Sequence, residues 1–133
     1  MTIQKLWDSG LLKPVNEGDD MEREITKLFC CDLLSIAMSK APADCAWVTV
    51  MGNMNTLAVA SLSDAACVIM AEGAHLDPTA LNKAKQQGIT VMETGLPIFD
   101  AALLIYKRLN PDAFADANDP TDGESQAATE KDL

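Results

Sequence analysis

The stretch at residues 45–51, CAWVTVM, is apolar at nearly every position, and this feature most constrains the fold. A strand with two apolar faces is typical of the centre of a parallel sheet that helices cover on either side. Gly52-Asn53 directly after it indicates a turn. The alanine-rich residues 55–62 then predict a helix that lies close to the sheet. The chain is therefore expected to be built around a buried strand, a polar turn and a close-packed helix.

The rest of the chain continues this alternation of strands and helices. Further strands are predicted at 22–31, 65–71 and 89–92, while residues 11–15, with Pro14, fit an edge strand or an extended lead-in. Helices are predicted at 2–9, 32–41, 77–88 and 97–109. In the second of these, Asp32 is the expected N-cap and a wide apolar face predicts a largely buried helix. The pattern predicts a three-layer α/β/α domain with a mainly parallel sheet of about four to five strands.

The length of 133 residues is that of one domain, and we place a single core in residues 1–109. The net charge of −10 is concentrated at the C-terminus, because residues 110–133 hold seven acids and one lysine. Residues 1–109 hold thirteen acids and nine bases. The acidic, proline-containing segment 110–133 has little apolar surface to bury and predicts a disordered tail. A docking peptide centred on Phe114 is the alternative.

Composition excludes several function classes. The bases are scattered, whereas nucleic-acid binders cluster them, so no nucleic-acid partner is expected. Four cysteines without CxxC spacing indicate reduced core thiols and no metal site. No apolar run approaches the roughly 18 residues of a membrane span. The N-terminal stretch MTIQKLWDSG also lacks the apolar region of a signal peptide. We therefore expect a cytoplasmic protein with no cofactor and no membrane partner.

Ligands of open α/β sheets bind beyond the C-terminal ends of the strands, so the strand ends define the candidate site. Polar and small residues follow the predicted strands there, and helix N-termini among them would attract an anion. Asp32 and Asn53 have a simpler interpretation as helix caps, and the glycines as turn residues. Asn55 and Glu72 are the better ligand-binding candidates. Asn55 is an amide in the turn beside an apolar helix. Glu72 is a lone carboxylate that ends a buried strand, where burial could perturb its pKa. The expected ligand-binding residues are Asp32, Gly52, Asn53, Asn55, Glu72, Gly73 and Thr94, beside Thr49, His75 and Gly95.

No catalytic motif accompanies these residues. The P-loop pattern GxxxxGK[ST] is missing, as are GxGxxG, HExxH and GxSxG. His75, the only histidine, has no evident Ser or Cys partner in the sequence. A small enzyme that uses Glu72 or His75 is consequently the weakest of the functional hypotheses.

The chain resembles a stand-alone DRTGG domain, which is similar to the N-terminal domain of HPr kinase/phosphorylase. The resemblance is carried by CDLLS at residues 31–35, the segment 47–60 with NTLAVA, the Val68-Ile69 strand, and residues 84–89. Lys27-Leu28 stand where the motif that names the family has paired glycines. The resemblance covers most of residues 1–109, and without a P-loop or a kinase domain it does not imply HPr kinase activity.

The resemblance implies a non-catalytic regulatory or ligand-sensing module that self-associates. The first hypothesis is therefore a homodimer that binds a small anionic or nucleotide-like ligand at the strand ends. The second is an interaction protein or accessory subunit of a redox system of the iron hydrogenase type, with no small ligand. Such small family members resemble proteins encoded near iron hydrogenases in anaerobes.

Overall fold

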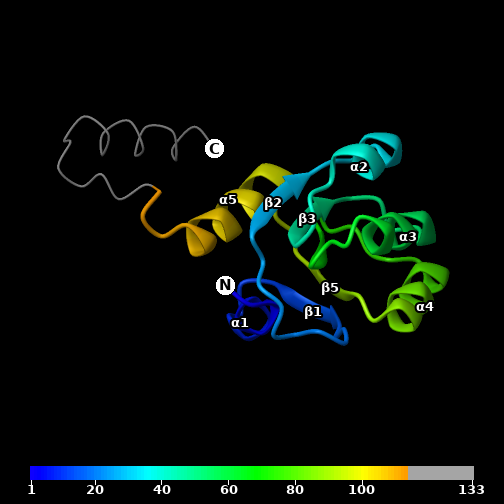
Figure 1. Cartoon of the computed structure of the whole chain (residues 1–133), viewed down its shortest axis with the longest axis horizontal. Coiled ribbons are helices and arrows are strands. Elements are labelled where there is room, and N and C mark those ends of the chain that lie inside the picture. Colours follow the sequence, from blue (N-terminus) through cyan, green and yellow to red (C-terminus); the bar gives the residue numbers. More distant parts are fainter. Residues whose placement is uncertain (114–133) are drawn as a thin grey trace.

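A computed structural model describes residues 1–113, and it contains one five-stranded sheet flanked by helices (Figure 1). The strand order is β1-β5-β4-β3-β2, in which β2 to β5 are parallel and β1 is antiparallel to β5. This confirms the predicted fold class and the edge position of β1. The strands are β1 (Lys13–Asn16), β2 (Lys27–Cys30), β3 (Cys45–Thr49), β4 (Cys67–Met70) and β5 (Thr90–Glu93).

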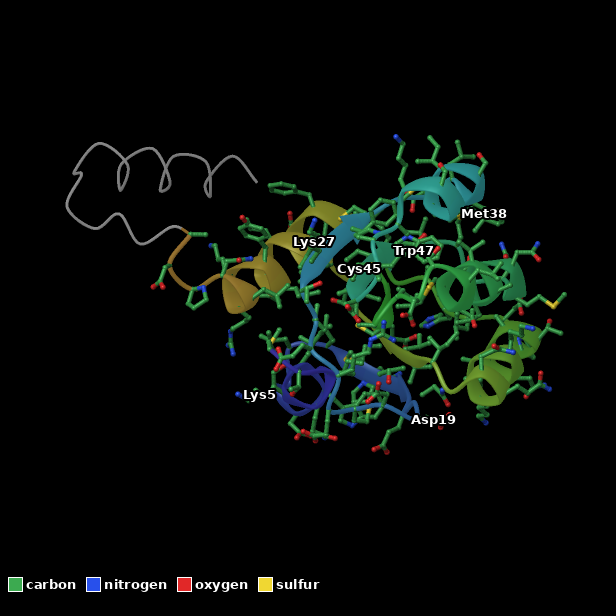
Figure 2. The ribbon with its side chains drawn as sticks, viewed as in Figure 1. Lys5, Asp19, Lys27, Met38, Cys45 and Trp47 are labelled. Atoms are coloured by element: carbon green, nitrogen blue, oxygen red, sulfur yellow. The ribbon has the colours of Figure 1, made fainter. Side chains whose placement is uncertain are left out.

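The five helices of residues 1–113 divide between the two faces of the sheet. On one face lie α2 (Leu34–Lys40), α3 (Met54–Leu62) and α4 (Pro78–Gln87). On the other lie α1 (Ile3–Asp8) and α5 (Ile98–Leu109). Every residue of β3 is buried, with Cys45 and Trp47 packed on the first face and Ala46 and Val48 on the second. Trp47 lies inside the molecule in Figure 2, and its indole N–H donates to the Cys31 carbonyl oxygen at 3.0 Å.

Local signals explain where three of the helices start and where one of them stops. Thr2 caps α1, Asn53 caps α3 and Asp77 caps α4, each through a side-chain oxygen that accepts a backbone N–H. Gly88 ends α4 in the left-handed conformation with φ 66°. These predicted boundaries are confirmed.

The strand predicted at residues 22–31 is shorter than expected. It begins only at Lys27, because the preceding segment is paired with the N-terminus instead of the sheet. The Ile3 amide donates to the Arg23 carbonyl oxygen at 3.0 Å, and the Ile25 amide donates to that of Met1 at 2.9 Å. The β-branched residues of this segment therefore support a local antiparallel contact with the start of the chain.

The prediction for α2 is wrong in two respects. Leu33, not Asp32, occupies the N-cap position, and it makes no side-chain cap. Only Ala37 of the helix is buried, while Leu33, Ile36 and Met38 are 56%, 47% and 58% exposed. The wide apolar stripe that predicted a buried helix lies on the surface. In Figure 2, Met38 projects from the periphery of the molecule.

The four cysteines differ in their exposure. All four thiols are free; Cys45 and Cys67 are buried, but Cys30 is exposed and Cys31 half-buried, so the core interpretation is wrong for Cys30.

Among residues 1–113, no helix has the length and apolar character needed to cross a bilayer. Residues 114–133 lie outside the described part of the chain, so the acidic tail, the Phe114 docking peptide and the boundary at residue 109 stay predictions.

Candidate functional site

In the part of the chain that the structure describes, the sheet has one position where adjacent parallel strands send their following helices to opposite faces. The chain leaves β4 for α4 on one face, whereas it leaves β5 for α5 on the other. In open α/β sheets such a divergence leaves a crevice beyond the carboxyl ends of the two strands. The crossovers from β2, β3 and β4 all use the same face, so no comparable divergence exists among them.

A depression of about 290 Å³ lies at this divergence. One wall comes from the connection after β4, a second from the end of β5, and a third from the antiparallel edge strand β1. Its volume is at the lower end of the range for ligand sites, which suits a small ligand. The residues that line it are Lys13, Gly73, Ala74, His75, Glu93, Thr94 and Gly95.

Glu93 is the central polar group of this crevice. Its side chain is only 10% exposed, and its two carboxylate oxygens have different partners. Oε2 lies 3.0 Å from Nδ1 of His75, and Oε1 lies 3.4 Å from Nζ of Lys13. Lys13 and His75 are 75% and 71% exposed. The crevice therefore has a carboxylate at its base and two nitrogen groups at its rim.

Two consecutive left-handed residues shape the wall that follows β4. Glu72 has φ 61° and Gly73 φ 74°, a conformation that is uncommon for a residue with a side chain. The Gly73 amide donates to the Thr94 carbonyl oxygen at 3.0 Å, and the Glu72 amide to that of Leu96 at 2.8 Å. These bonds hold the two loops together before they separate, so the mouth of the crevice has a fixed backbone.

Comparison with known proteins finds this fold in a solved structure. The chain matches no protein-family model and no curated protein sequence. One similar solved structure is that of the CBS and DRTGG domains of the regulatory region of Clostridium perfringens pyrophosphatase, complexed with the activator diadenosine tetraphosphate. Its TM-score is 0.64 at 15% sequence identity, over 78% of this chain and 45% of that chain. At this identity the likeness shows a shared fold alone. This chain spans less than half of the other.

Of the seven residues predicted to bind a ligand, the structure brings Gly73 and Thr94 together in the crevice. Gly52, Asn53 and Asn55 belong to the turn after β3 and do not line it. Asn53 accepts the amides of the first turn of α3, as its simpler interpretation requires.

Gly52 has a structural role as well. A Cβ atom there would clash with the carbonyl oxygen of His75, and the Gly52 carbonyl accepts the Asp77 amide at 2.8 Å. The missing side chain lets the two loops approach each other. The turn after β3 thus supports the wall of the crevice from outside.

Asp32 and Glu72 each hold two elements together. Oδ1 of Asp32 accepts the Thr49 hydroxyl at 3.2 Å and the Val50 amide at 3.3 Å, which ties the end of β2 to the end of β3. Oε2 of Glu72 accepts the Ile98 amide at 2.9 Å. Glu72 is exposed, contrary to the expectation of a buried carboxylate, and it caps α5 from a distant part of the chain.

Sequence reasoning missed Lys13 and Glu93. Glu93 is the one charged residue of a fully buried strand, and that pattern could have drawn attention to it. The proximity of Lys13 to Glu93 can be recognised only from the pairing of β1 with β5, in which the two residues lie opposite each other. Within residues 1–113 no group of three or more His, Cys, Asp or Glu side chains could hold a metal ion.

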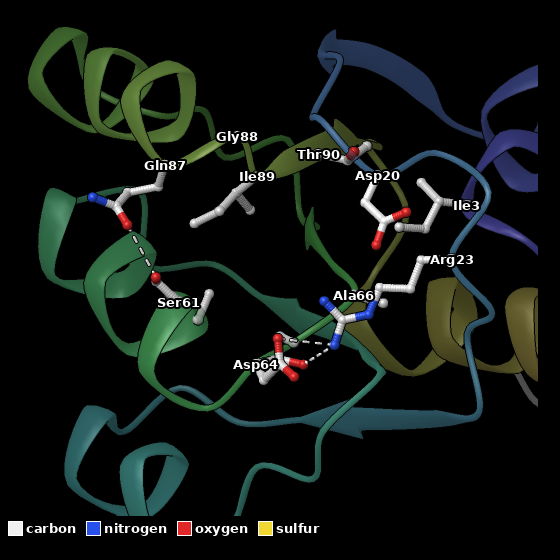
Figure 3. A pocket seen from close by; sticks show the side chains of 12 residues that line it. Ile3, Asp20, Arg23, Ser61, Asp64, Ala66, Gln87, Gly88, Ile89 and Thr90 are labelled. Carbon is white, nitrogen blue, oxygen red and sulfur yellow. Dashed lines mark hydrogen bonds and ion pairs between the residues drawn. The ribbon is translucent and has the colours of Figure 1, made fainter.

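A smaller depression of about 110 Å³ lies at the opposite, N-terminal edge of the strands (Figure 3). Its positively charged group is Arg23, whose Nε donates to Oδ1 of Asp44 at 2.7 Å and whose Nη2 lies 3.1 Å from Oδ1 of Asp64. Burial lowers the pKa of Arg23, but the hydrogen bond that Arg23 donates to Asp44 and the charge of Asp64 raise it by more, so the net pKa lies above the ordinary value. Because Arg23 is occupied by these partners, we interpret this depression as structural.

Proposed function

We propose that this chain is a regulatory or ligand-sensing module, a cytoplasmic homodimer that binds a small anionic or nucleotide-like ligand at the carboxyl ends of β4 and β5. The observation that carries the proposal is the buried Glu93 carboxylate between Lys13 and His75, at the one divergence in the sheet. The pyrophosphatase regulatory region, which was solved with a nucleotide activator, supports a regulatory role through its fold.

The charges of the crevice restrict how such a ligand would sit. A carboxylate at the base repels anions, so the phosphate or carboxylate of the ligand belongs at the rim, beside the Lys13 ammonium. The Glu93 oxygens accept hydrogen bonds, so a hydroxyl or amino group of the ligand would point inward. The side chains of Ala74 and Thr94 and the backbone of two glycines leave the remaining walls uncharged. A ribose or small polyol phosphate has this distribution of groups.

A thermal-shift panel tests the proposal. The full chain is melted with inorganic phosphate, ribose 5-phosphate, AMP, ATP and diadenosine tetraphosphate. A compound present at about 100 times its dissociation constant should add roughly 2.7 kcal/mol to the free energy of unfolding. A panel in which no compound raises the melting temperature would contradict the ligand-sensing function.

Variants locate the binding site. Lys13→Met removes the exposed rim charge, and we expect it to weaken binding of the active compound about tenfold or more. Glu93→Gln keeps the size of the side chain and should change the preference for ligand hydroxyl groups. Lys85→Met on α4 is the matched control, since Lys85 is exposed and does not line the crevice. Equal affinity in all three variants would exclude this crevice.

Protein interaction without a small ligand is the second candidate, in which the chain serves a redox enzyme as an accessory subunit. It is favoured by the exposed large apolar side chains on α2 and α5, among them Met38 and Phe99. A flat ligand panel together with a stable complex with such an enzyme would support it.

A further inference from the structure

The strand β2 forms one end of the sheet in the described residues, with β3 beside it and no strand on its other side. The Cys31 amide donates inward to the Val48 carbonyl oxygen. Backbone groups of a strand alternate in direction, so those of Leu28 and Cys30 point outward. An edge of this kind is a template for pairing with another strand.

The helices on the two faces of the sheet at this edge carry most of the exposed large apolar side chains. Residues 1–113 contain eight exposed large hydrophobic residues, and five of them are on α5 or on α2 and its N-cap: Leu33, Ile36, Met38, Phe99 and Tyr106. Isolated exposed apolar residues need no explanation, but Phe99 and Tyr106 line one groove together with Leu28 of β2, and a contiguous apolar patch marks an interaction surface. We name the surface formed by β2, α2 and the outer side of α5 the β2 face.

An apolar groove of about 180 Å³ runs between β2 and α5 within this face. It is lined by Leu28 of the strand and by Phe99, Ala102, Leu103 and Tyr106 of the helix. Phe99, Leu103 and Tyr106 are spaced at i, i+4 and i+7, so they lie on one side of α5. Leu103 is at the middle of this stripe, which has an aromatic ring at each end.

We propose that the β2 face is covered by a second copy of this chain, related by a two-fold axis, with the two β2 strands paired antiparallel into a continuous sheet. This inference rests on the homodimer of the proposed function and adds its contact face. The same axis runs the two α5 helices antiparallel across the interface and brings Leu103 near its own copy. Phe99 of each chain then meets Tyr106 of the other, so the stripe is complementary to itself.

The charges on α5 are complementary in the same arrangement. Asp100 lies in the first turn of the helix, and Lys107 and Arg108 lie in the last. Antiparallel contact places the acidic end of each helix beside the basic end of its partner, and it also opposes the two helix dipoles. A parallel arrangement would bring like charges together. The helix therefore selects the orientation that pairing of the strands requires.

The spacing of β2 and α5 also allows the two β2 strands and the two α5 helices to make contact in the same dimer. Paired strands are about 4.8 Å apart, so the axis lies about 2.4 Å outside β2. The helix α5 contacts both β2 and β3. If it lies midway above them, its axis is about 4.8 Å from the two-fold axis. The two α5 axes are then about 10 Å apart, at the upper limit of the normal distance for packed helices. Strand pairing and helix packing can thus form together.

Sedimentation velocity of the full chain tests the β2 face. Cys30→Pro removes an outward amide, which leaves the β2–β3 bonds intact, and Cys30→Ala is its control. Leu103→Glu puts a charge at the centre of the stripe. Leu62→Glu is the matched control, because Leu62 is 76% exposed at the end of α3, away from the face. Circular dichroism and melting verify that each variant is folded.

The wild type, Cys30→Ala and Leu62→Glu should sediment as dimers. Cys30→Pro and Leu103→Glu, if folded, should weaken self-association about 100-fold. A dimer that persists in both of these variants would overturn the β2 face and leave the homodimer standing. A wild-type monomer at all concentrations would overturn both and point to another occupant, such as the chain's own C-terminal segment or a different protein. Neither result bears on ligand binding in the crevice.

Discussion

Replacement of Arg23 by Met tests whether the residues of the depression at the N-terminal edge of the strands serve to stabilise the fold. The Arg23 side chain is 20% exposed, and it joins the segment before β2 to Asp44 before β3 and to Asp64 before β4. Both aspartates have left-handed backbone conformations, with φ 64° and 58°. Arg23 also donates to the Asp64 carbonyl oxygen. One guanidinium therefore holds three chain segments in place at the start of the sheet.

The expected loss of stability follows from these contacts. A hydrogen bond to a charged group contributes about 1.5–3 kcal/mol, and Arg23 makes two to Asp44 and Asp64 besides the one to a carbonyl oxygen. The aspartate side chains are 44% and 73% exposed, so water solvates them once Arg23 is removed, and the loss is smaller than the sum. We expect Arg23→Met to lower the free energy of unfolding by about 3 kcal/mol. The melting temperature should then fall by roughly 12 °C.

Urea denaturation and calorimetry measure this loss, with Lys5→Met as the control for removal of one exposed positive charge from α1. The control should stay within about 0.5 kcal/mol of the wild type. A loss below about 1 kcal/mol in Arg23→Met would refute the reasoning, since the guanidinium would then not hold the segments together. The depression in Figure 3 would in that case need a functional explanation.

Three further predictions concern the backbone and the thiols. Gly52→Ala should destabilise the fold by about 2 kcal/mol or more in urea denaturation, because its Cβ meets the His75 carbonyl oxygen, whereas Gly95→Ala, with open space, should not. In the folded, monomeric Leu103→Glu variant, in which the β2 face is uncovered, iodoacetamide should label Cys30 and spare Cys45 and Cys67, as read by mass spectrometry; desolvation and the charge of Asp32 raise the pKa of Cys30, so its labelling should accelerate with alkaline pH. Burial raises the pKa of Cys67 from 9.0 to about 12, so the stability that depends on its protonated form is complete below pH 9.0 and is lost as the pH rises toward 12. The stability of the wild type relative to Cys67→Ala should therefore fall by about 2 kcal/mol between pH 9.0 and roughly 10.5, and an unchanged difference would contradict this assignment.

The fold class was predictable because its signals are local. The apolar residues of β3 indicated burial on both faces, and the side chains of Asn53 and Asp77 act on amides two or three residues away. The prediction for Asp32 failed because the same carboxylate can accept from a neighbouring strand, and residue spacing does not show which partner is closer. Glu72 shows the same limit, since it caps a helix that begins 26 residues later.

The candidate site was only partly predictable, since it depends on which face each helix covers. A sequence shows that α3, α4 and α5 follow strands, but it does not show that α5 alone crosses to the face of α1. Without that fact, the ends of β3, β4 and β5 are equivalent, and residues from all three were chosen. The crossing makes the end of β4–β5 distinct. As a result, Gly73 and Thr94 line the crevice and Asn55 does not.

The position of Glu93 joins the fold to the proposed function. A carboxylate at the end of a buried strand loses hydration, and the chain supplies two partners from different connections, Lys13 from β1 and His75 from the loop before α4. Both partners remain mostly exposed, so each can turn toward a ligand while Glu93 stays in place. Binding at the rim would then change the contacts of β1 with β5 and of the loop before α4 at once. A small ligand in this crevice would thereby act on two elements that are far apart in the sequence, which is the property a regulatory domain needs.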